Sequence, residues 1–107
     1  MLKMKNKEKI KYYNNLEKAM AILGKLSNNP KILLNRKLLD GVEGLDEELQ
    51  ELWSSDKKKE IPKENYIYYV DLMKQTKDLE KLTNNKTVIT KLQTVYNKLE
   101  ENKNILL

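Results

Sequence analysis

An internal repeat limits the folds open to this chain more than any other feature. Residues 7–33 (KEKIKYYNNLEKAMAILGKLSNNPKIL) and residues 63–89 (KENYIYYVDLMKQTKDLEKLTNNKTVI) lie 56 positions apart and agree at 11 of 27 positions without a gap. Because the chain is rich in Lys, Leu and Asn, roughly 3 matches would arise by chance. The excess indicates that one folding unit occurs twice.

The first copy predicts a helix, a tight turn and a second helix. Its apolar residues are spaced by four, three, four and three positions, as on one face of a helix; they are Tyr12, Leu16, Ala19, Leu23 and Leu26. The sequence Asn28-Asn29-Pro30 should then end this helix. Asn29 is suited to cap the next helix and Pro30 to occupy its first position, so the two helices should be antiparallel neighbours.

The second helix contains two glycines that favour an interruption. The helical spacing continues past them, through Leu38, Val42, Leu45, Leu49 and Leu52. Each glycine, however, costs about 1 kcal/mol in a helix interior. We therefore expect the helix to be kinked or broken near Gly41–Gly44, with a break and a restart at Leu45 favoured over a continuous kinked helix.

The second copy follows a linker at residues 54–62, SSDKKKEIP. Pro62 should open a third helix that ends near Leu82, with a seam at Tyr68, Leu72, Gln75, Leu79 and Leu82. Its first half, YIYYVDLM, is apolar on nearly every side and is expected to be the best buried part of the chain. A Thr83–Asn85 turn leads to a fourth helix, whose apolar positions are Val88, Leu92, Val95 and Leu99.

Four amphipathic helices joined by short turns predict an all-α fold. We expect an antiparallel four-helix bundle, up-down-up-down, built from two similar helical hairpins at about residues 4–53 and 63–104. One hairpin could not bury its apolar stripe alone, so residues 1–107 should form a single helical domain. In this interpretation the repeated residues serve folding.

Residue types exclude most catalytic chemistry. The chain has no Cys, no His and one Arg, so the usual nucleophile and base pairs cannot be assembled. Glu48 and Glu51 resemble the first ExxE pair of helical nucleotide pyrophosphatases, but neither Asp71 nor Asp78 has the Glu three residues earlier that the second pair needs. We expect a non-enzyme without metal, cofactor or small-molecule substrate.

Charge is unevenly spread along the chain. The net charge of +5 divides into +5 for residues 1–25, −4 for residues 26–56 and +4 for residues 57–107. A basic protein is attracted to nucleic acid or to an anionic membrane surface, and the candidate nucleic-acid contacts are Lys57, Lys58 and Lys59. Base recognition usually relies on Arg, however, and Arg36 is the only Arg in the sequence.

Binding of another protein is therefore the favoured function, in an accessory, adaptor or inhibitor role. The candidate partner-binding residues are Trp53, an aromatic that could anchor a partner, and the acidic run Asp46, Glu47, Glu48 and Glu51, which could meet a basic one. Trp53 could instead plug the end of the bundle. No apolar run reaches the length of a signal peptide or a transmembrane helix, so we expect the protein in the cytoplasm. We expect it to be a monomer or a weak homodimer.

Two stretches resemble segments of known families. Residues 56–74, DKKKEIPKENYIYYVDLMK, resemble the approach to a late helix in the immunity proteins that protect producers of small antilisterial bacteriocins. That resemblance implies a basic, cytoplasmic four-helix bundle with a protective role. Trp53-Ser54-Ser55 and the YxxxE motif from Tyr96 to Glu100 resemble the turn and tail of small helical proteins secreted by type VII systems, with Ser in place of the expected Gly.

Overall fold

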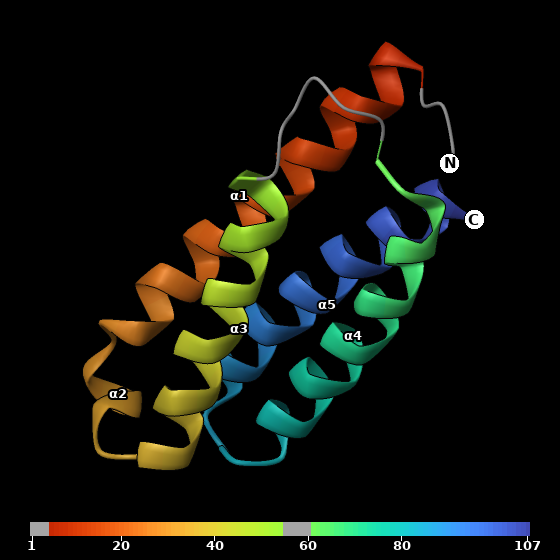
Figure 1. Ribbon diagram of the computed structural model, residues 1–107. Coiled ribbons are helices and arrows are strands. Elements are labelled where there is room, and N and C mark those ends of the chain that lie inside the picture. Colours follow the sequence, from red (N-terminus) through yellow and green to blue (C-terminus); the bar gives the residue numbers. More distant parts are fainter. Residues whose placement is uncertain (1–4, 55–60) are drawn as a thin grey trace.

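The computed structural model describes residues 5–54 and 61–107. The helices in these residues are α1 (Asn6–Ser27), α2 (Pro30–Leu33), α3 (Arg36–Ser54), the 3-10 turn η1 (Lys63–Asn65), α4 (Tyr66–Glu80) and α5 (Lys86–Leu106). The four long helices α1, α3, α4 and α5 run alternately up and down (Figure 1). The predicted all-α antiparallel bundle is confirmed.

Each long helix packs against two others, in the ring order α1, α3, α4, α5. The α4–α5, α1–α5 and α1–α3 pairs are in extensive contact, whereas α3 and α4 pack together less closely. One end of the bundle, which we call the α2 end, comprises α2, the end of α1, the start of α3, and the turn between α4 and α5 (Figure 1). The bundle is 43 Å long and 20 by 18 Å across.

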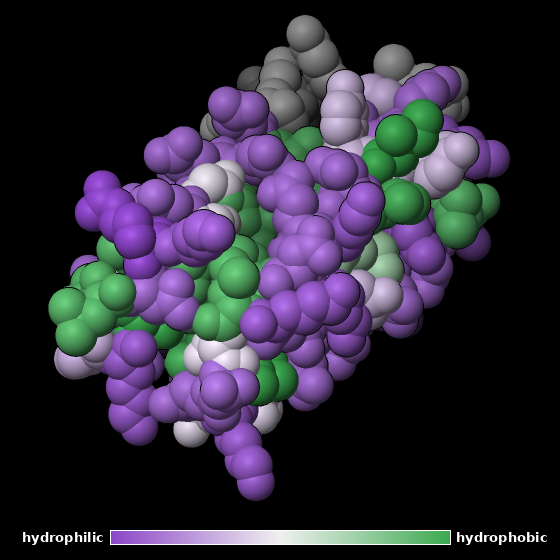
Figure 2. Space-filling model, turned by 90° about the horizontal axis from the view of Figure 1, so that it is seen from below, coloured by the Kyte–Doolittle hydropathy of each residue, from purple (hydrophilic) through white to green (hydrophobic). Residues whose placement is uncertain are grey.

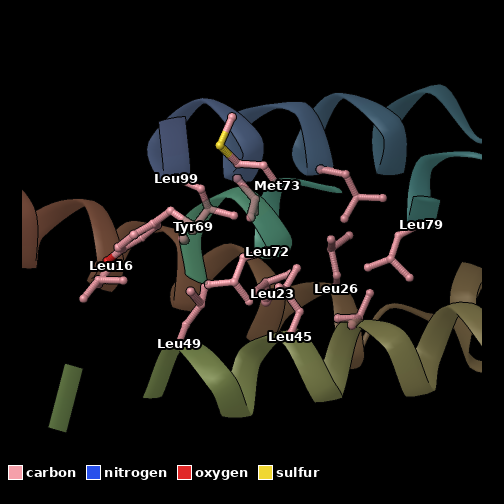
Figure 3. Packing of buried hydrophobic residues seen from close by; sticks show 14 of the residues in the cluster. Leu16, Leu23, Leu26, Leu45, Leu49, Tyr69, Leu72, Met73, Leu79 and Leu99 are labelled. Carbon is pink, nitrogen blue, oxygen red and sulfur yellow. The ribbon is translucent and has the colours of Figure 1, made fainter. Parts of the chain in front are cut away.

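The core confirms the predicted seams of three helices. Figure 3 shows leucines from facing helices meeting around Tyr69 and Met73. All five seam residues of α1 are at most 1% exposed, and so are the four predicted for α5. Four of the five predicted in α3 are buried as well, namely Leu38, Val42, Leu45 and Leu49. The four-three spacing thus located most of the buried surface.

The helix interruption in the first copy lies at Leu34–Asn35. Asn29 caps α2 as predicted, because its side-chain oxygen accepts a hydrogen bond from the backbone N–H of Lys31 at 2.9 Å. After one turn the chain restarts at Asn35, whose Oδ1 accepts from the N–H of Leu38 at 3.2 Å. Asn35 also donates to the carbonyl of Leu82 at 2.8 Å, which ties this junction to the α4–α5 turn.

The predicted break near Gly41–Gly44 was wrong, since α3 continues from Arg36 to Ser54. The burial of Val42 and Leu45 on one continuous face offsets the intrinsic cost of the glycines. Gly41 also has a packing role, because a Cβ at this position would overlap the side chain of Leu79 on α4. Gly44 has open space around it.

The predicted register of α4 was also wrong. Its buried residues are Tyr69, Leu72, Met73, Thr76 and Leu79, whereas Tyr68 is 59% exposed and Leu82 39%. The segment YIYYVDLM is apolar around the whole helix, so its pattern does not specify which face turns inward. Far from being the best buried part of the chain, it leaves four of its apolar side chains exposed.

A polar network lies inside the bundle near the start of α4. Asn102 on α5 is fully buried; its Nδ2 donates to the Tyr12 carbonyl at 3.1 Å and the Tyr69 hydroxyl at 3.2 Å. Its Oδ1 accepts from Asn15 Nδ2 at 2.8 Å. The rings of Tyr12 and Tyr69 meet edge to face at 5.9 Å, and their hydroxyls share a hydrogen bond. The network joins α1, α4 and α5.

Burial governs the ionisation of both network tyrosines. It raises the pKa of Tyr69 well above the ordinary value, and it raises the pKa of Tyr12 against the opposing effect of the hydrogen bond from Tyr69. Both hydroxyls are therefore neutral hydrogen-bonding groups at physiological pH. Ile61, in the segment predicted as a linker, is also buried.

Candidate functional site

A groove of about 560 Å³ lies between α3 and α4, where the ring of helices is least tightly packed. Its apolar lining comprises Leu52, Pro62, Tyr68 and Leu72. Three carboxylates border it, Glu48 and Glu51 from α3 and Asp71 from α4. None of the described lining residues is cationic. The groove can therefore accept an apolar group flanked by positive charge.

Exposed apolar side chains surround the first half of α4, and one of them, Tyr68, lines this groove. Ile67 is 58% exposed and Tyr68 59%, on a helix whose other side supplies the core. Tyr66 and Val70 are exposed as well, at 37% and 50%. They face different sides of the helix, since Tyr68 lines the α3–α4 groove and Val70 lines a hollow on the α4–α5 side. Their exposure was not predicted, because the segment is apolar on nearly every side and was expected to lie wholly in the core.

The predicted acidic residues do not form one surface. Glu48 and Glu51 border the α3–α4 groove, while Glu47, Glu51 and Trp53 line a second hollow of about 630 Å³ that includes Met20 of α1. A run of adjacent helical residues points in several directions, since each residue turns the helix by about 100°. The predicted cluster is thus divided between two sides of α3.

Asp46 lies on the partly buried side of α3. Its Oδ2 accepts a hydrogen bond from Gln50 Nε2 at 3.0 Å, while its Oδ1 is buried without a hydrogen-bond partner. Burial raises the pKa of this carboxyl, although the bond from Gln50 acts in the opposite direction. Of the four predicted acids, Asp46 is therefore the least available to a partner.

Trp53 lies in the last full turn of α3 and bridges to α1. Its indole Nε1 donates to Glu17 Oε1 at 3.1 Å, and its ring packs, half-buried, against the core. Trp53 thus packs along the side of α1, beside the middle of that helix. Its exposed part still borders the second hollow, next to Glu47.

Lysines other than the predicted candidate contacts cluster on the α4–α5 side of the bundle. The candidate contacts Lys57, Lys58 and Lys59 lie outside the described residues. On the α4–α5 side, four lysines line a further groove; they are Lys74, Lys77, Lys81 and Lys103. Lys77 Nζ lies 4.4 Å from the centre of the Tyr96 ring, which covers a face that a base could otherwise stack on.

The α2 end exposes two leucines. Ile32 is buried, but Leu33 is 48% exposed and Leu34 97%. A signal for this was present in the sequence, because three consecutive apolar residues cannot all lie on the buried face of one helix.

Within residues 5–54 and 61–107, no group of three or more acidic side chains is placed to hold a metal ion. No helix in the same ranges is long and apolar enough to cross a membrane.

Comparison with protein-family models, with curated proteins and with solved structures gives no match. The resemblances to immunity proteins and to type VII-secreted proteins therefore stay predictions.

Proposed function

We propose that this protein acts by binding another protein at the α3–α4 groove, and that the bound segment is an amphipathic helix with basic side chains. The observation that carries this proposal is Tyr68, which is 59% exposed at the edge of an apolar groove whose described lining contains carboxylates and no cation. The role is that of an accessory, adaptor or inhibitor protein. It involves no catalysis, in keeping with a chain without His or Cys.

The apolar part of the groove supports binding of a helix. Leu52 and Leu72 come from facing helices and leave a strip between them that side chains spaced by three and four positions could enter. Tyr68 offers a large rigid ring with a polar tip, which is the kind of residue that dominates the binding energy of interfaces.

The charged part of the groove supports a basic partner. Glu48 stands on α3 and Asp71 on α4, so a segment lying between the helices would have a carboxylate on each side. Asp71 Oδ2 accepts a hydrogen bond from Gln75 Nε2 at 2.7 Å, which holds that carboxylate in place. Complementary charge of this kind speeds association and sets the orientation of the partner.

The proposed place of action is the cytoplasm, as expected from the sequence. Expression of a tagged protein in a bacterium, followed by separation of cytoplasm, membrane and medium, tests this setting. Recovery of the protein mainly from the medium would instead favour the type VII resemblance.

The binding proposal can be tested with a defined probe, a fluorescein-labelled 18-residue peptide of Leu and Lys arranged with one apolar helical face. Fluorescence anisotropy should show saturable binding. Tyr68→Ala should weaken it by roughly tenfold or more, because an aromatic anchor in an interface is typically worth above ~1.4 kcal/mol. Tyr66→Ala is the matched control and should change the affinity little, since Tyr66 is not among the described lining residues.

Charge reversal provides a second arm. Glu48→Lys/Asp71→Lys should abolish binding, whereas Glu43→Lys/Glu100→Lys makes the same change in net charge away from the groove and should keep most of it. Equal binding of a scrambled Leu/Lys peptide would contradict the proposal. So would an unchanged affinity in Tyr68→Ala.

A further inference from the structure

The most exposed large hydrophobic side chain among the described residues lies at the α2 end. Leu34 is 97% exposed, and Leu33 beside it is 48% exposed. Their position follows from the helix interruption, since α2 makes a single turn that places Ile32 in the core and leaves the chain to restart at Asn35. The two leucines therefore project from the end of the bundle.

A third leucine reaches the same end from the second copy. Leu82 in the α4–α5 turn is 39% exposed, and its carbonyl accepts the hydrogen bond from Asn35. Two chain segments 47 residues apart thus meet at this end, and each carries exposed leucine. In Figure 2 a green patch projects at the left, at the end where Figure 1 shows α2, with purple hydrophilic groups around it.

Basic residues flank these leucines in both chain segments. Residues 25–37 and 81–86 contain no acidic residue. Their six basic residues are all exposed; they are Lys25, Lys31, Arg36, Lys37, Lys81 and Lys86. Three acids flank these ranges: Asp40 and Asp78 form exposed ion pairs with Arg36 and Lys81 at 3.5 and 4.0 Å, and Glu80 pairs with Lys77 at 3.5 Å. Because such pairs are weak, the positive charge remains available to a binding surface.

We propose that the α2 end is a contact surface for an anionic lipid bilayer. Leu33 and Leu34 enter the interfacial region of the bilayer, and the surrounding lysines and Arg36 lie among the headgroups. Protruding apolar groups ringed by cations have the two parts that peripheral membrane binding requires, an apolar insertion and attraction to anionic lipid. A nucleic acid would use the cations but would gain nothing from a fully exposed leucine.

This surface is separate from the α3–α4 groove. Glu48 follows Arg36 by 12 residues in one continuous helix, which corresponds to about 18 Å along its axis. A protein bound to a membrane through the α2 end would therefore keep the groove accessible. Failure of either proposal leaves the other intact, because neither Tyr68 nor Glu48 belongs to the α2 end.

Vesicle flotation tests the proposal with the full-length protein. We expect binding to vesicles of phosphatidylcholine with about a third phosphatidylserine, and little binding to phosphatidylcholine alone. Leu34→Ser should weaken binding roughly tenfold, while the matched control Ile67→Ser, which replaces another exposed residue on α4, should not. Lys31→Gln/Arg36→Gln/Lys37→Gln should weaken it by roughly fivefold for each cation removed.

A charge-matched control separates a local surface from general attraction. Lys5→Gln/Lys7→Gln/Lys18→Gln removes three exposed cations from other parts of α1 and its cap and should leave most of the binding. Equal losses in the two triple variants would overturn the proposal. Absence of vesicle binding at low salt, together with binding of a short DNA duplex that Leu34→Ser does not change, would overturn it in favour of nucleic acid.

Site-specific labelling reports insertion directly. The chain has no Cys, so Leu34→Cys can be labelled at one position with an environment-sensitive fluorophore. Anionic vesicles should increase and blue-shift its emission, and the same label at Ile67→Cys should not respond. An unchanged spectrum at position 34 while the protein floats with the vesicles would show that the leucines stay in water, which contradicts the proposal.

Discussion

Replacing Asn102 with Leu tests whether the internal polar network holds three helices together. Asn102 is fully buried, donates two hydrogen bonds and accepts one, and its partners lie on α1 and α4. Asn102→Leu removes all three bonds. It also leaves the Nδ2 of Asn15, a residue only 4% exposed, without its partner.

The expected loss of stability can be estimated from these contacts. Each hydrogen bond between neutral groups contributes about 1 kcal/mol net, and a buried donor left unpaired costs about 1–3 kcal/mol. A leucine at position 102 recovers part of this through its apolar surface. We expect the free energy of unfolding to fall by about 3 kcal/mol, and the melting temperature by about 12–24 °C in a domain of this size.

A double-mutant cycle with Asn15→Leu isolates the pair. Removing both amides leaves no unpaired donor at position 15, so Asn15→Leu/Asn102→Leu should be destabilised by less than the sum of the single variants. Urea unfolding followed by far-ultraviolet circular dichroism measures all four proteins. Losses that add within about 0.5 kcal/mol would refute the reasoning, because they would show that the two asparagines do not depend on each other.

Three further outcomes are expected. Gly41→Ala should be less stable than Gly44→Ala by about 1–3 kcal/mol in thermal unfolding, because its Cβ would overlap Leu79. Gly44→Ala, with open space around it, should stabilise the bundle by about 0.5–1 kcal/mol. Burial raises the pKa of Tyr69, so the stabilisation from its neutral hydroxyl is complete below the unfolded-state pKa of 10.0 and is lost as the pH rises through the folded-state pKa. Tyr69→Phe should therefore reduce the loss of stability at alkaline pH, measured by urea unfolding. Burial also raises the pKa of Asp46, so Asp46→Asn should be more stable than the parent chain at pH 7. This difference in stability should disappear below about pH 4, where the carboxyl is protonated in both states. The exposed control Glu43→Gln should show no such difference.

The parts of the fold that the sequence predicted are those where one local rule acts alone. The Asn29 cap was predictable because a polar side chain before a helix start satisfies a free backbone N–H, as the side chain of Asn29 does here. The seams of α1 and α5 were readable because apolar residues lie on one face only.

The errors arose where tertiary packing outweighs local preference. The intrinsic cost of two glycines suggested a break, but the close approach of Leu79 to Gly41 could not be inferred from the residues of α3 alone. The actual break lies at Leu34–Asn35, where Asn35 also bonds to Leu82, a residue 47 positions away. The candidate site shared this difficulty, since Glu48 was named from sequence, whereas its neighbour across the groove, Tyr68, was assigned to the core.

The two copies of the repeat use the same Tyr-Tyr pair differently, and the polar network gives the reason. In the first copy Tyr12 is buried and Tyr13 only partly so; in the second copy Tyr68 is exposed and Tyr69 fully buried. Because α4 is apolar around its first half, hydrophobic burial alone would accept either tyrosine. Asn102 distinguishes them, since its amide reaches the Tyr69 hydroxyl and the Tyr12 carbonyl together. Turning Tyr69 inward leaves Tyr68 at the groove, so the contact that fixes the rotation of α4 also presents the residue on which the proposed binding depends.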